Sequence, residues 1–459
     1  MSEGAPGPER RQVSLGLFSV LASVQALFLA LALLAIERVE RPVLFTGLLA
    51  LASVPWMWLA WLVFVEKRSI PVAWVLSAGL LLRLIGQLGG PSLSDDLYRY
   101  VWEGRMQLAG KNPYLLAPEH PSVRAPGDPV WERVNHREVP AAYPPVCQLY
   151  LRLLAATGGG VVWFRAGFAL LDVLLLFLLA AWLARIGVDP GRSLVYALCP
   201  LVVVELGTEG HNDSLALFLL IAALALLGRA GDGETRASWT RISLVGVLYG
   251  ASIAAKFLPG FLLPWLLRRD WRLLPACLVT VCLGYLPFLE GVERLGDLFE
   301  GLDQYATRWR ANDSMFILIH DATASVQEWL KSTGSESWFA TAALHRTSKV
   351  PLYAILLVGG LIVFLVEKEP GRVPAPMLAL LFIVTPTLHP WYVCWVVPFL
   401  ARTPSPALFV LVAGVPLSYH PLPLWRSQGE WVELPSYKLL EFAPFYGLLL
   451  LGILRRLRR

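Results

Sequence analysis

Apolar stretches separated by short charged or turn-rich breaks follow one another along almost the whole chain. A helix needs about 20 apolar residues to cross the hydrocarbon core of a bilayer, and several stretches reach that length. Lipid offers the backbone no hydrogen-bond partners, so such stretches must form helices, and none alternates like a barrel strand. The pattern predicts an all-α polytopic integral membrane protein with roughly 12 to 14 transmembrane or re-entrant helices. The predicted helices occupy residues 14–36, 43–65, 70–88, 161–184, 193–206, 214–228, 242–254, 257–267, 273–289, 350–366, 374–386, 391–400, 405–417 and 437–454.

Composition agrees with this class of protein. Of 459 residues, 56% are hydrophobic and only 16% are charged, which is too apolar for one water-soluble core. The first stretch is too long for a signal-peptide core and follows Arg10 and Arg11, so we expect it to remain as the first helix. The five cysteines show no spacing typical of a zinc or redox site, and the net charge of +5 indicates no nucleic-acid partner. We expect residues 1–459 to form a single membrane domain.

Basic residues are divided unevenly between the two sets of short loops. Cytoplasmic loops of membrane proteins are enriched in Lys and Arg, so the asymmetry predicts the orientation. The poorer set holds five basic residues: Arg38, Arg41, Lys256, Arg426 and Lys438. The richer set holds nineteen: Arg10, Arg11, Lys67, Arg68, Arg185, Arg192, Arg229, Arg236, Arg241, Arg268, Arg269, Arg272, Lys368, Arg372, Arg402, Arg455, Arg456, Arg458 and Arg459. Both termini are therefore expected in the cytoplasm, and two long loops, residues 89–160 and 290–349, on the outer side.

The first long outer loop begins with an acid pair, Asp95 and Asp96, in a short amphipathic pattern. We expect a helix there, with Ser94 as its N-cap and the acids in its first turn, where the helix dipole favours negative charge. Capping alone would explain the acids, but their place at the mouth of a membrane helix favours a functional role. Adjacent side chains on a helix diverge by about 100°, so the two carboxylates are expected to do different jobs. The side chains expected to supply apolar surface at the membrane interface are Leu97, Tyr100, Val101 and Trp102.

A second polar cluster, residues 208–214, lies between two apolar stretches on the same expected side. It contains Glu209, His211 and Asp213, and Glu205 precedes it within the apolar stretch. A solvated tight turn would explain its Gly, Asn, Asp and Ser residues. Charged groups cost on the order of 3 kcal/mol at the bilayer centre and therefore usually face a cavity or a partner. This cost favours a functional role for the cluster.

Further polar residues are candidates on the same side. Lys256 precedes a proline-interrupted stretch, where it would either snorkel to the interface or present its ammonium to a phosphate. Arg165 and Asp172 lie seven residues apart on one helical face, and we expect a buried structural ion pair between them. Weaker candidates are Tyr305, Arg308, Arg310, His389 and Tyr392.

Residues 94–105, followed by 110–114, resemble the first outer loop of bacterial mannosyltransferase-like proteins of the GT-C class. Members of this class are glycosyltransferases that depend on a polyprenyl-phosphate sugar. The segments 143–145, 210–213 and 256–259 come in the order expected of that family, and the resemblance spans residues 93–264.

The resemblance implies a mechanism and a set of roles. A carboxylate of the first outer loop serves as general base for an acceptor hydroxyl, with Asp95 as the first choice and Asp96 in reserve. No residue separates these two acids, so an Asp-x-Asp metal clamp is not indicated, although carboxylates would suit a divalent cation. The residues implied to bind the donor phosphate are His211, Lys256, Arg308 and Arg310. The residues implied to bind substrate are Tyr98, Arg99, Trp102, Asn212, Asp213 and His389.

We therefore expect an enzyme that transfers a hexose, with mannose as the first choice, from a polyprenyl-phosphate carrier to a lipid or glycan acceptor. Its site would lie at the outer face of the inner (plasma) membrane, with membrane lipids around it and no nucleic acid. The alternative is a non-enzymatic transporter or flippase of lipid-linked glycans. A transporter would place ionisable residues near the midplane of broken helices, often in two related halves. Most candidates here lie at the outer boundary, whereas Glu205 and the interrupted 256–264 stretch fit the alternative.

Overall fold

The computed structural model describes residues 11–228 and 238–458, and regular structure in these ranges is helical apart from two isolated bridges. A bent pair of helices, Pro190–Ala197 and Pro200–Thr208, meets at an angle of 59°. If this pair crosses the membrane as a unit, it adds one span to the seven single helices that follow. Seven helices in the described ranges are long and apolar enough to cross a membrane: Leu15–Leu34, Pro42–Phe64, Val161–Arg185, Trp271–Phe288, Leu344–Val366, Pro406–Gln428 and Pro435–Arg455. The predicted all-α, polytopic, membrane-embedded class is confirmed.

Every predicted apolar stretch contains helical turns, although several are broken into short pieces at prolines. Proline starts a helix readily and often kinks or breaks one in its interior, and residues such as Pro200 and Pro259 divide the later stretches. The longer helices are α1 (Leu15–Leu34), α2 (Pro42–Phe64), α3 (Val72–Leu88), α4 (Asp96–Leu108), α5 (Pro145–Thr157), α6 (Val161–Arg185), α9 (Asp213–Leu227), α10 (Trp239–Ala255), α12 (Leu274–Tyr285), α14 (Phe316–Ser332), α17 (Lys349–Val366), α18 (Pro374–Val384) and α23 (Pro435–Leu457).

The shorter α-helices are α7 (Leu194–Ala197), α8 (Pro200–Val202), α11 (Leu263–Arg269), α13 (Glu300–Arg308), α15 (Trp338–Thr341), α16 (Leu344–Thr347), α19 (Pro390–Val393), α20 (Val397–Leu400), α21 (Pro406–Gly414) and α22 (Leu422–Gln428). The 3-10 turns are η1 (Trp131–Arg133), η2 (Pro190–Ser193), η4 (Leu258–Leu262), η5 (Trp271–Leu273), η6 (Leu286–Phe288), η7 (Leu295–Phe299), η8 (Cys394–Val396) and η9 (Val415–Tyr419). The segment η3 (Val203–Thr208) is a π-helix. Helices α5, α13, α14, α15 and α16 lie in or beside the two predicted long loops, and the apolar pattern did not predict them.

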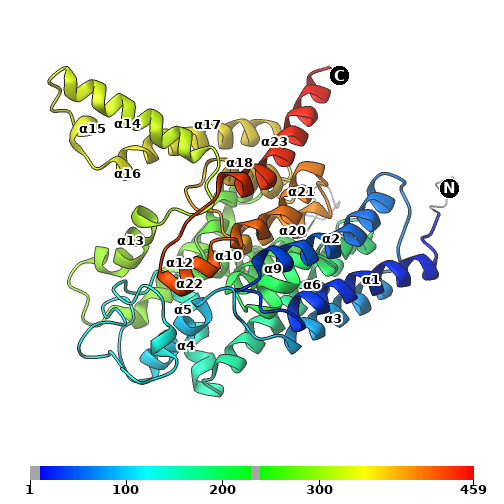
Figure 1. Ribbon diagram of the computed structural model, residues 1–459, viewed down its shortest axis with the longest axis horizontal. Coiled ribbons are helices and arrows are strands. Elements are labelled where there is room, and N and C mark those ends of the chain that lie inside the picture. The colour runs from blue at the N-terminus through cyan, green and yellow to red at the C-terminus, as the bar shows by residue number, and fades with distance from the viewer. Residues whose placement is uncertain (1–10, 229–237, 459) are drawn as a thin grey trace.

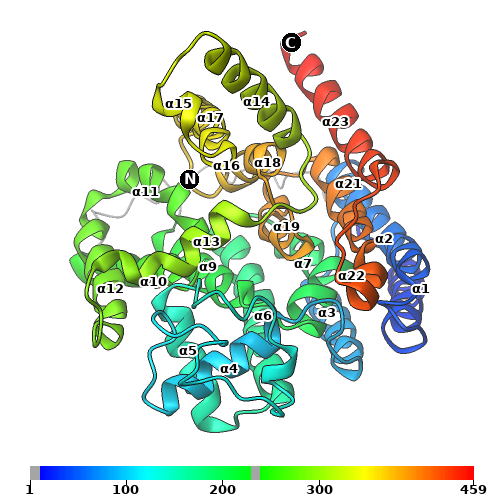
Figure 2. The same cartoon turned by 60° about the vertical axis from the view of Figure 1, so that its left-hand side comes forward.

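The helices pack as a bundle, and its two flanks are formed by different parts of the chain. Helices α1 and α2 form one flank, α10, α11 and α12 form the opposite flank, and α6, α7 and α9 lie between them (Figure 2). The two long segments, residues 89–160 and 290–349, lie toward the left-hand end of the bundle in Figure 1, whereas the start of α1 and the end of α23 lie on the right. The side of the membrane on which each end lies stays a prediction.

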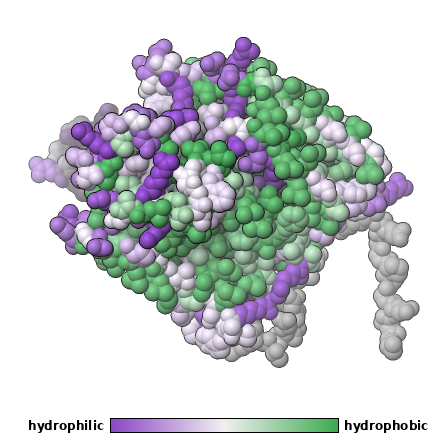
Figure 3. All heavy atoms as spheres, turned by 90° about the horizontal axis from the view of Figure 1, so that it is seen from below, coloured by the Kyte–Doolittle hydropathy of each residue, from purple (hydrophilic) through white to green (hydrophobic). Residues whose placement is uncertain are grey.

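The flanks present apolar surface where a water-soluble protein would be polar. Large apolar side chains of α17 are widely exposed, with Leu357 at 74% and Val366 at 77%. Figure 3 shows a broad apolar surface on one face of the molecule, with most hydrophilic residues toward the left-hand end, where the long segments lie. Exposure on this scale is untenable in water and natural in lipid.

Several of the basic segments predicted to share one side lie together at the end of the bundle where α1 begins. The backbone of Arg11 pairs with that of Ser69, between α2 and α3. The Arg192 guanidinium lies 5.2 Å from the ring centre of Phe64. Four of the nineteen basic residues lie outside the described residues: Arg10, Arg229, Arg236 and Arg459.

Two local predictions need correction. The expected ion pair between Arg165 and Asp172 is wrong, because Asp172 pairs with Arg83 of α3 at 2.9 Å. Spacing along α6 showed which residues share a face, but a neighbouring helix supplies the nearer cation. The helix after the acid pair is confirmed, yet its N-cap position is Asp95 rather than Ser94. The side chains expected at the membrane interface are buried instead in a core beneath α4: Leu97, Tyr100, Val101 and Trp102.

Candidate active site

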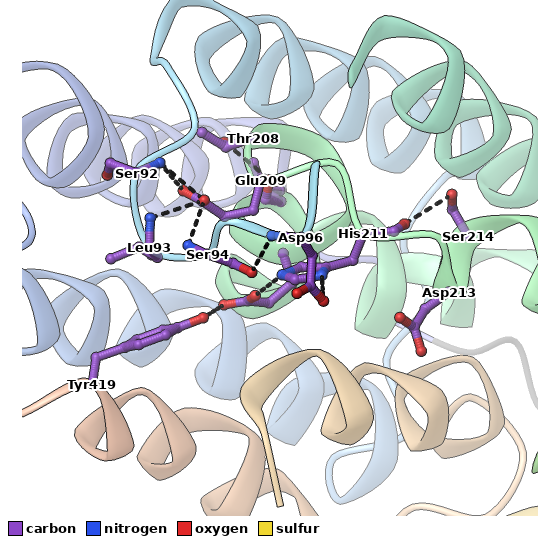
Figure 4. A network of polar contacts seen from close by, with 12 residues as sticks. Ser92, Leu93, Ser94, Asp96, Thr208, Glu209, His211, Asp213, Ser214 and Tyr419 are labelled. Atoms are coloured by element: carbon purple, nitrogen blue, oxygen red, sulfur yellow. Dashed lines mark hydrogen bonds and ion pairs between the residues drawn. The ribbon is translucent and has the colours of Figure 1, made fainter. Parts of the chain in front are cut away.

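The segment that connects α3 to the acid pair is held by three buried charges. Glu209 accepts the backbone N–H groups of Ser92 and Leu93, each at 3.0 Å, and pairs with Arg38 at 2.9 Å. Arg38 also donates to the Gly90 carbonyl. Figure 4 shows the Glu209 carboxylate facing the turn formed by residues 92–94. Because a buried carboxylate is stable only when its oxygens are paired, this contact determines where α4 begins.

The other side of the same segment is held by α6. Arg165 donates to the carbonyl of Gln87 at 3.0 Å and to that of Gly89. Its guanidinium therefore holds the end of α3, which is a different role from the expected ion pair. Two arginines and one glutamate, all remote in sequence, thus determine the position of the acid pair.

The two acids face different partners, as their adjacent places on the helix required. Asp95 binds Arg426 of α22 at 2.7 Å and Arg133 of the first long segment at 3.2 Å. Each of its carboxylate oxygens is therefore engaged by a guanidinium. Asp95 joins the start of α4 to two distant segments.

Asp96 faces the interior of the polar cluster. One carboxylate oxygen accepts from the Asn135 amide at 3.3 Å, and the other accepts from the Tyr143 hydroxyl at 3.2 Å and lies 3.9 Å from Nδ1 of His211. Burial raises the pKa of Tyr143 well above its usual value, and the charge of Asp96 adds to the shift. The phenol therefore stays protonated and donates to the carboxylate. The Asp96 side chain keeps 19% of its surface exposed, so it remains within reach of a substrate.

His211 lies between two carboxylates. Its Nε2 atom is 3.4 Å from Glu205, and its ring stacks on Trp391 of α19 with a centroid distance of 4.1 Å. The second oxygen of Glu205 accepts the Tyr419 hydroxyl at 2.8 Å. Burial opposes protonation of His211, but the carboxylates of Glu205 and Asp96 outweigh it, so the pKa of His211 is raised. Figure 4 shows Asp96, His211 and Tyr419 arranged along this line.

A second ion pair lies at the start of α9. Lys256 binds the buried Asp213 at 2.6 Å, and Trp395 donates its indole N–H to the same oxygen. The Lys256 ammonium lies 4.9 Å from the ring centre of Tyr392, whose hydroxyl bonds to that of Tyr305. Lys256 thus connects the second polar cluster to α13 and α19.

Several buried polar atoms of the cluster have no hydrogen-bond partner among the described residues. They are Oε2 of Glu205, both ring nitrogens of His211, Oδ1 of Asn212 and Oδ2 of Asp213. Nδ2 of Asn212 is engaged with the thiol of Cys147 at 3.3 Å. Unsatisfied buried polar atoms are costly and few in folded proteins, so their concentration here points to a place that binds polar ligands.

His389 belongs to the wall of the same site. Its ring stacks on Trp391 at a centroid distance of 4.3 Å, the same indole that His211 contacts. Burial lowers the pKa of His389 to about 4. The imidazole is therefore neutral at physiological pH and offers a hydrogen-bonding ring rather than a cation.

The remaining predicted residues lie at different depths. Arg99 is buried, pairs with Glu103 at 2.8 Å and binds backbone carbonyls of residues 135–140, which positions Asn135. Trp102 lies in the core beneath α4. Tyr98 lies at the rim, where the Arg133 guanidinium covers its ring at 4.0 Å.

The two arginines of the second long segment also differ from each other. Arg310 pairs with Asp313 at 2.7 Å, in a separate ion-pair cluster with Lys438. Arg308, at the end of α13, is exposed and has no ion-pair partner among the described residues. The described residues contain no group of three or more His, Cys, Asp and Glu side chains suited to a metal ion, and a divalent cation stays a prediction.

Sequence reasoning did not identify Arg38, Asn135, Trp391 or Tyr419 as part of this site. Asn135 and Tyr419 carry no local signal, because each meets the cluster only through folding. Trp391 lies beside two predicted site residues, His389 and Tyr392, in an otherwise apolar stretch. This neighbourhood was the only sequence feature that could have identified it.

Residues 13–268 match the family model for the N-terminal domain of alpha-(1->6)-mannopyranosyltransferases. The matched range contains Asp96, Glu205, His211 and Lys256, whereas Trp391 comes from the rest of the chain. No curated protein matches the chain, and no solved structure matches it.

Proposed function

Because residues 13–268 match its model, the chain belongs to the alpha-(1->6)-mannopyranosyltransferase family, and we propose that it takes mannose from a polyprenyl-phosphate donor. Membership makes the chain a membrane-embedded glycosyltransferase and supports mannosyl transfer. In the proposed reaction the acceptor is a hydroxyl group of a lipid or glycan. The reaction takes place at the end of the bundle that carries the acid pair.

The observation that carries the proposal is the position of Asp96. It is a partly exposed carboxylate at the edge of a cluster rich in unpartnered polar atoms. Asp96 accepts the proton of the acceptor hydroxyl as its oxygen attacks the anomeric carbon. The bond from that carbon to the phosphate oxygen breaks, and its electron pair leaves with the polyprenyl phosphate. The new glycosidic bond, the protonated Asp96 and the released lipid phosphate account for every atom and charge.

Geometry favours Asp96 over Asp95 as the base. One oxygen of Asp95 accepts an N–H of Arg133 and the other forms an ion pair with Arg426 at 2.7 Å, so a guanidinium already occupies each oxygen. Asp96 receives only neutral donors from Asn135 and Tyr143. In this assignment Asp95 orients the start of α4, and Asp96 acts as the base.

The donor phosphate needs positive charge beside the cluster. Lys256 retains 16% exposure and lies under Tyr392, and Arg308 at the end of the nearby α13 has no ion-pair partner among the described residues. Together they are placed to stabilise the phosphate as it leaves. His211 lies deeper, between two carboxylates, so in this proposal it acts on Asp96 rather than on the phosphate.

The outer, non-cytoplasmic face is the proposed side of the reaction. Arg11 and Arg192 mark the basic end of the bundle, and α4, which begins at Asp96, lies at the other end. Basic loops face the cytoplasm, which supports this orientation and the inner membrane as its place.

The test is transfer of labelled mannose from a synthetic polyprenyl-phosphate donor by matched amounts of purified wild type, Asp96→Asn and Asp95→Asn. Asparagine keeps the size of the acid and one of its two acceptor oxygens but cannot take the proton, so Asp96→Asn should lose about 10²- to 10⁴-fold in turnover. Asp95→Asn should lose less. Full turnover in Asp96→Asn with collapse in Asp95→Asn would return the base role to Asp95. Absence of any transfer by wild type would reject the polyprenyl-phosphate donor.

A further inference from the structure

Glu205 has a setting that the proposed transfer does not yet explain. It is fully buried in η3, the π-helical part of the second bent helix, which leads directly into the second polar cluster. Single π-helical turns are rare and often mark functional sites, because the wider turn redirects a side chain. A buried carboxylate is also expensive in an apolar bundle unless partners stabilise it.

The partners of Glu205 are few and specific. Oε1 accepts the hydroxyl of Tyr419 at 2.8 Å, and Oε2 lies 3.4 Å from Nε2 of His211. The nearby Glu209 is already satisfied by Arg38 and by backbone N–H groups. No Lys or Arg of the described chain forms an ion pair with Glu205, so the imidazole is its cationic partner when protonated.

The opposite edge of the imidazole faces the proposed base. Nδ1 of His211 lies 3.9 Å from Oδ2 of Asp96, and the Trp391 indole supports the ring face at 4.1 Å. These contacts form one line, Tyr419 to Glu205 to His211 to Asp96. Figure 4 labels Tyr419, His211 and Asp96 along it. Catalytic hydrogen bonds are often long in the free enzyme and shorten when substrate binds.

We propose that Glu205 is a positioning residue that orients His211 as the proton store of Asp96. This inference rests on the proposed function. In this proposal the hydrogen of neutral His211 is on Nε2, which faces Glu205 at 3.4 Å, and the Nδ1 lone pair is directed at Asp96. When Asp96 takes the acceptor proton, the proton passes to Nδ1, and the imidazolium lies between two carboxylates. After product release the proton returns through the exposed edge of Asp96 to water, so no other reactant is needed.

Other titratable groups around this line shape its response to pH. Asp213, Glu209 and His389 act on His211, and Cys394 lies near Glu205. Because the groups are coupled, the acid limb of a pH–rate profile belongs to the Asp96–His211 unit rather than to one residue. A change in Glu205 should therefore move that limb, which a purely structural effect would not do.

The experiment records the pH profile of kcat/KM for mannosyl transfer by purified wild type, Glu205→Gln, Tyr419→Phe and Glu441→Gln. Glu205→Gln removes the counter-charge of the imidazolium, so the acid limb should move about one pH unit or more toward lower pH. Turnover at neutral pH should fall at least about 10-fold, with an unchanged KM for the donor. Tyr419→Phe removes a hydrogen-bond donor from the Glu205 carboxylate, which strengthens the attraction of that carboxylate for the imidazolium proton. The acid limb of this variant should therefore move toward higher pH.

Glu441→Gln is the matched control. Glu441 is also a buried carboxylate, but its partner is the Asn312 amide at 2.9 Å, outside this line. Its acid limb should stay in place. An unmoved limb in Glu205→Gln, with or without lost turnover, would overturn the proton-store role while leaving the transferase proposal intact. If Glu205→Gln fails to fold, an unmoved limb in Tyr419→Phe has the same consequence. An inactive wild type would instead reject the proposed function.

Discussion

Folding gives adjacent residues of this site separate partners, and the roles proposed for them follow from those partners. Asp95 and Asp96 are chemically identical neighbours, yet one meets two guanidinium groups and the other meets an amide, a phenol and an imidazole. The same contrast separates Glu209, which holds backbone N–H groups, from Glu205, which faces His211. At the residue scale, function follows from what each carboxylate contacts.

Lys256 offers a prediction at this scale. Lys256→Ala leaves the buried Asp213 without its cation, so we expect about 3 kcal/mol of lost stability and a donor KM raised about 10-fold or more. The double variant Lys256→Ala with Asp213→Asn removes the unpaired charge and should recover most of the stability. It should not recover the donor KM, because the phosphate still lacks its ammonium. Thermal unfolding in detergent and donor saturation curves measure the two effects, and a normal donor KM in both variants would exclude Lys256 from donor binding.

At the scale of elements, the position of Lys256 depends on how α10 packs against α12. A Cβ atom on Gly246 would lie 2.3 Å from the Leu273 carbonyl oxygen, and one on Gly250 would lie 2.6 Å from that of Cys277. The two glycines are four residues apart on one face of α10, a spacing that lets membrane helices approach closely. The close approach holds the end of α10, and therefore Lys256, beside α9.

Replacement of either glycine should separate these helices. Gly250→Ala should lower the stability by about 1–3 kcal/mol, because backbone cannot move aside as a flexible side chain would. It should also raise the donor KM, since Lys256 follows directly after α10. Gly47→Ala in α2 is the control, because a Cβ there has no heavy atom within 4 Å. Equal unfolding temperatures for the two variants would contradict the close packing of α10 on α12.

At the scale of the whole molecule, the site is built from both halves of the chain. The range that matches the family model supplies Asp96, Glu205 and His211, and the remainder supplies Trp391 and Tyr419. The two long segments share the end of the bundle that carries the acid pair (Figure 1). The proposed reaction therefore depends on the complete bundle and on its orientation in the membrane.

The proposed orientation can be tested by accessibility. Arg124→Cys in the first long segment and Glu336→Cys in the second should react with an impermeant thiol reagent in intact cells. Lys368→Cys, at the basic end, should react only after permeabilisation, because basic loops remain in the cytoplasm. All three positions are exposed, and the background is Cys282→Ser, which removes the exposed native thiol. Labelling of Lys368→Cys alone in intact cells would reverse the orientation.

The order of apolar stretches along this chain was sufficient to determine its class. Lipid leaves a backbone few ways to satisfy its polar groups, so long apolar stretches had to become helices, and each predicted stretch contains helical turns. The acid pair, His211 and Lys256 could be selected as candidates because charged groups are costly near lipid and stand out in an apolar sequence. Helix α14 was missed because no apolar stretch marks it, and sequence reasoning foresaw only loop there.

Partners remote in sequence were decided only by the tertiary structure. The pairing of Asp172 with Arg83 instead of Arg165, and the burial of Trp102, depend on which helices become neighbours. So does the line from Tyr419 to Asp96, which joins residues more than three hundred positions apart. A periodic pattern specifies which residues share a face of one helix, whereas the atom that meets each face depends on how all the helices pack.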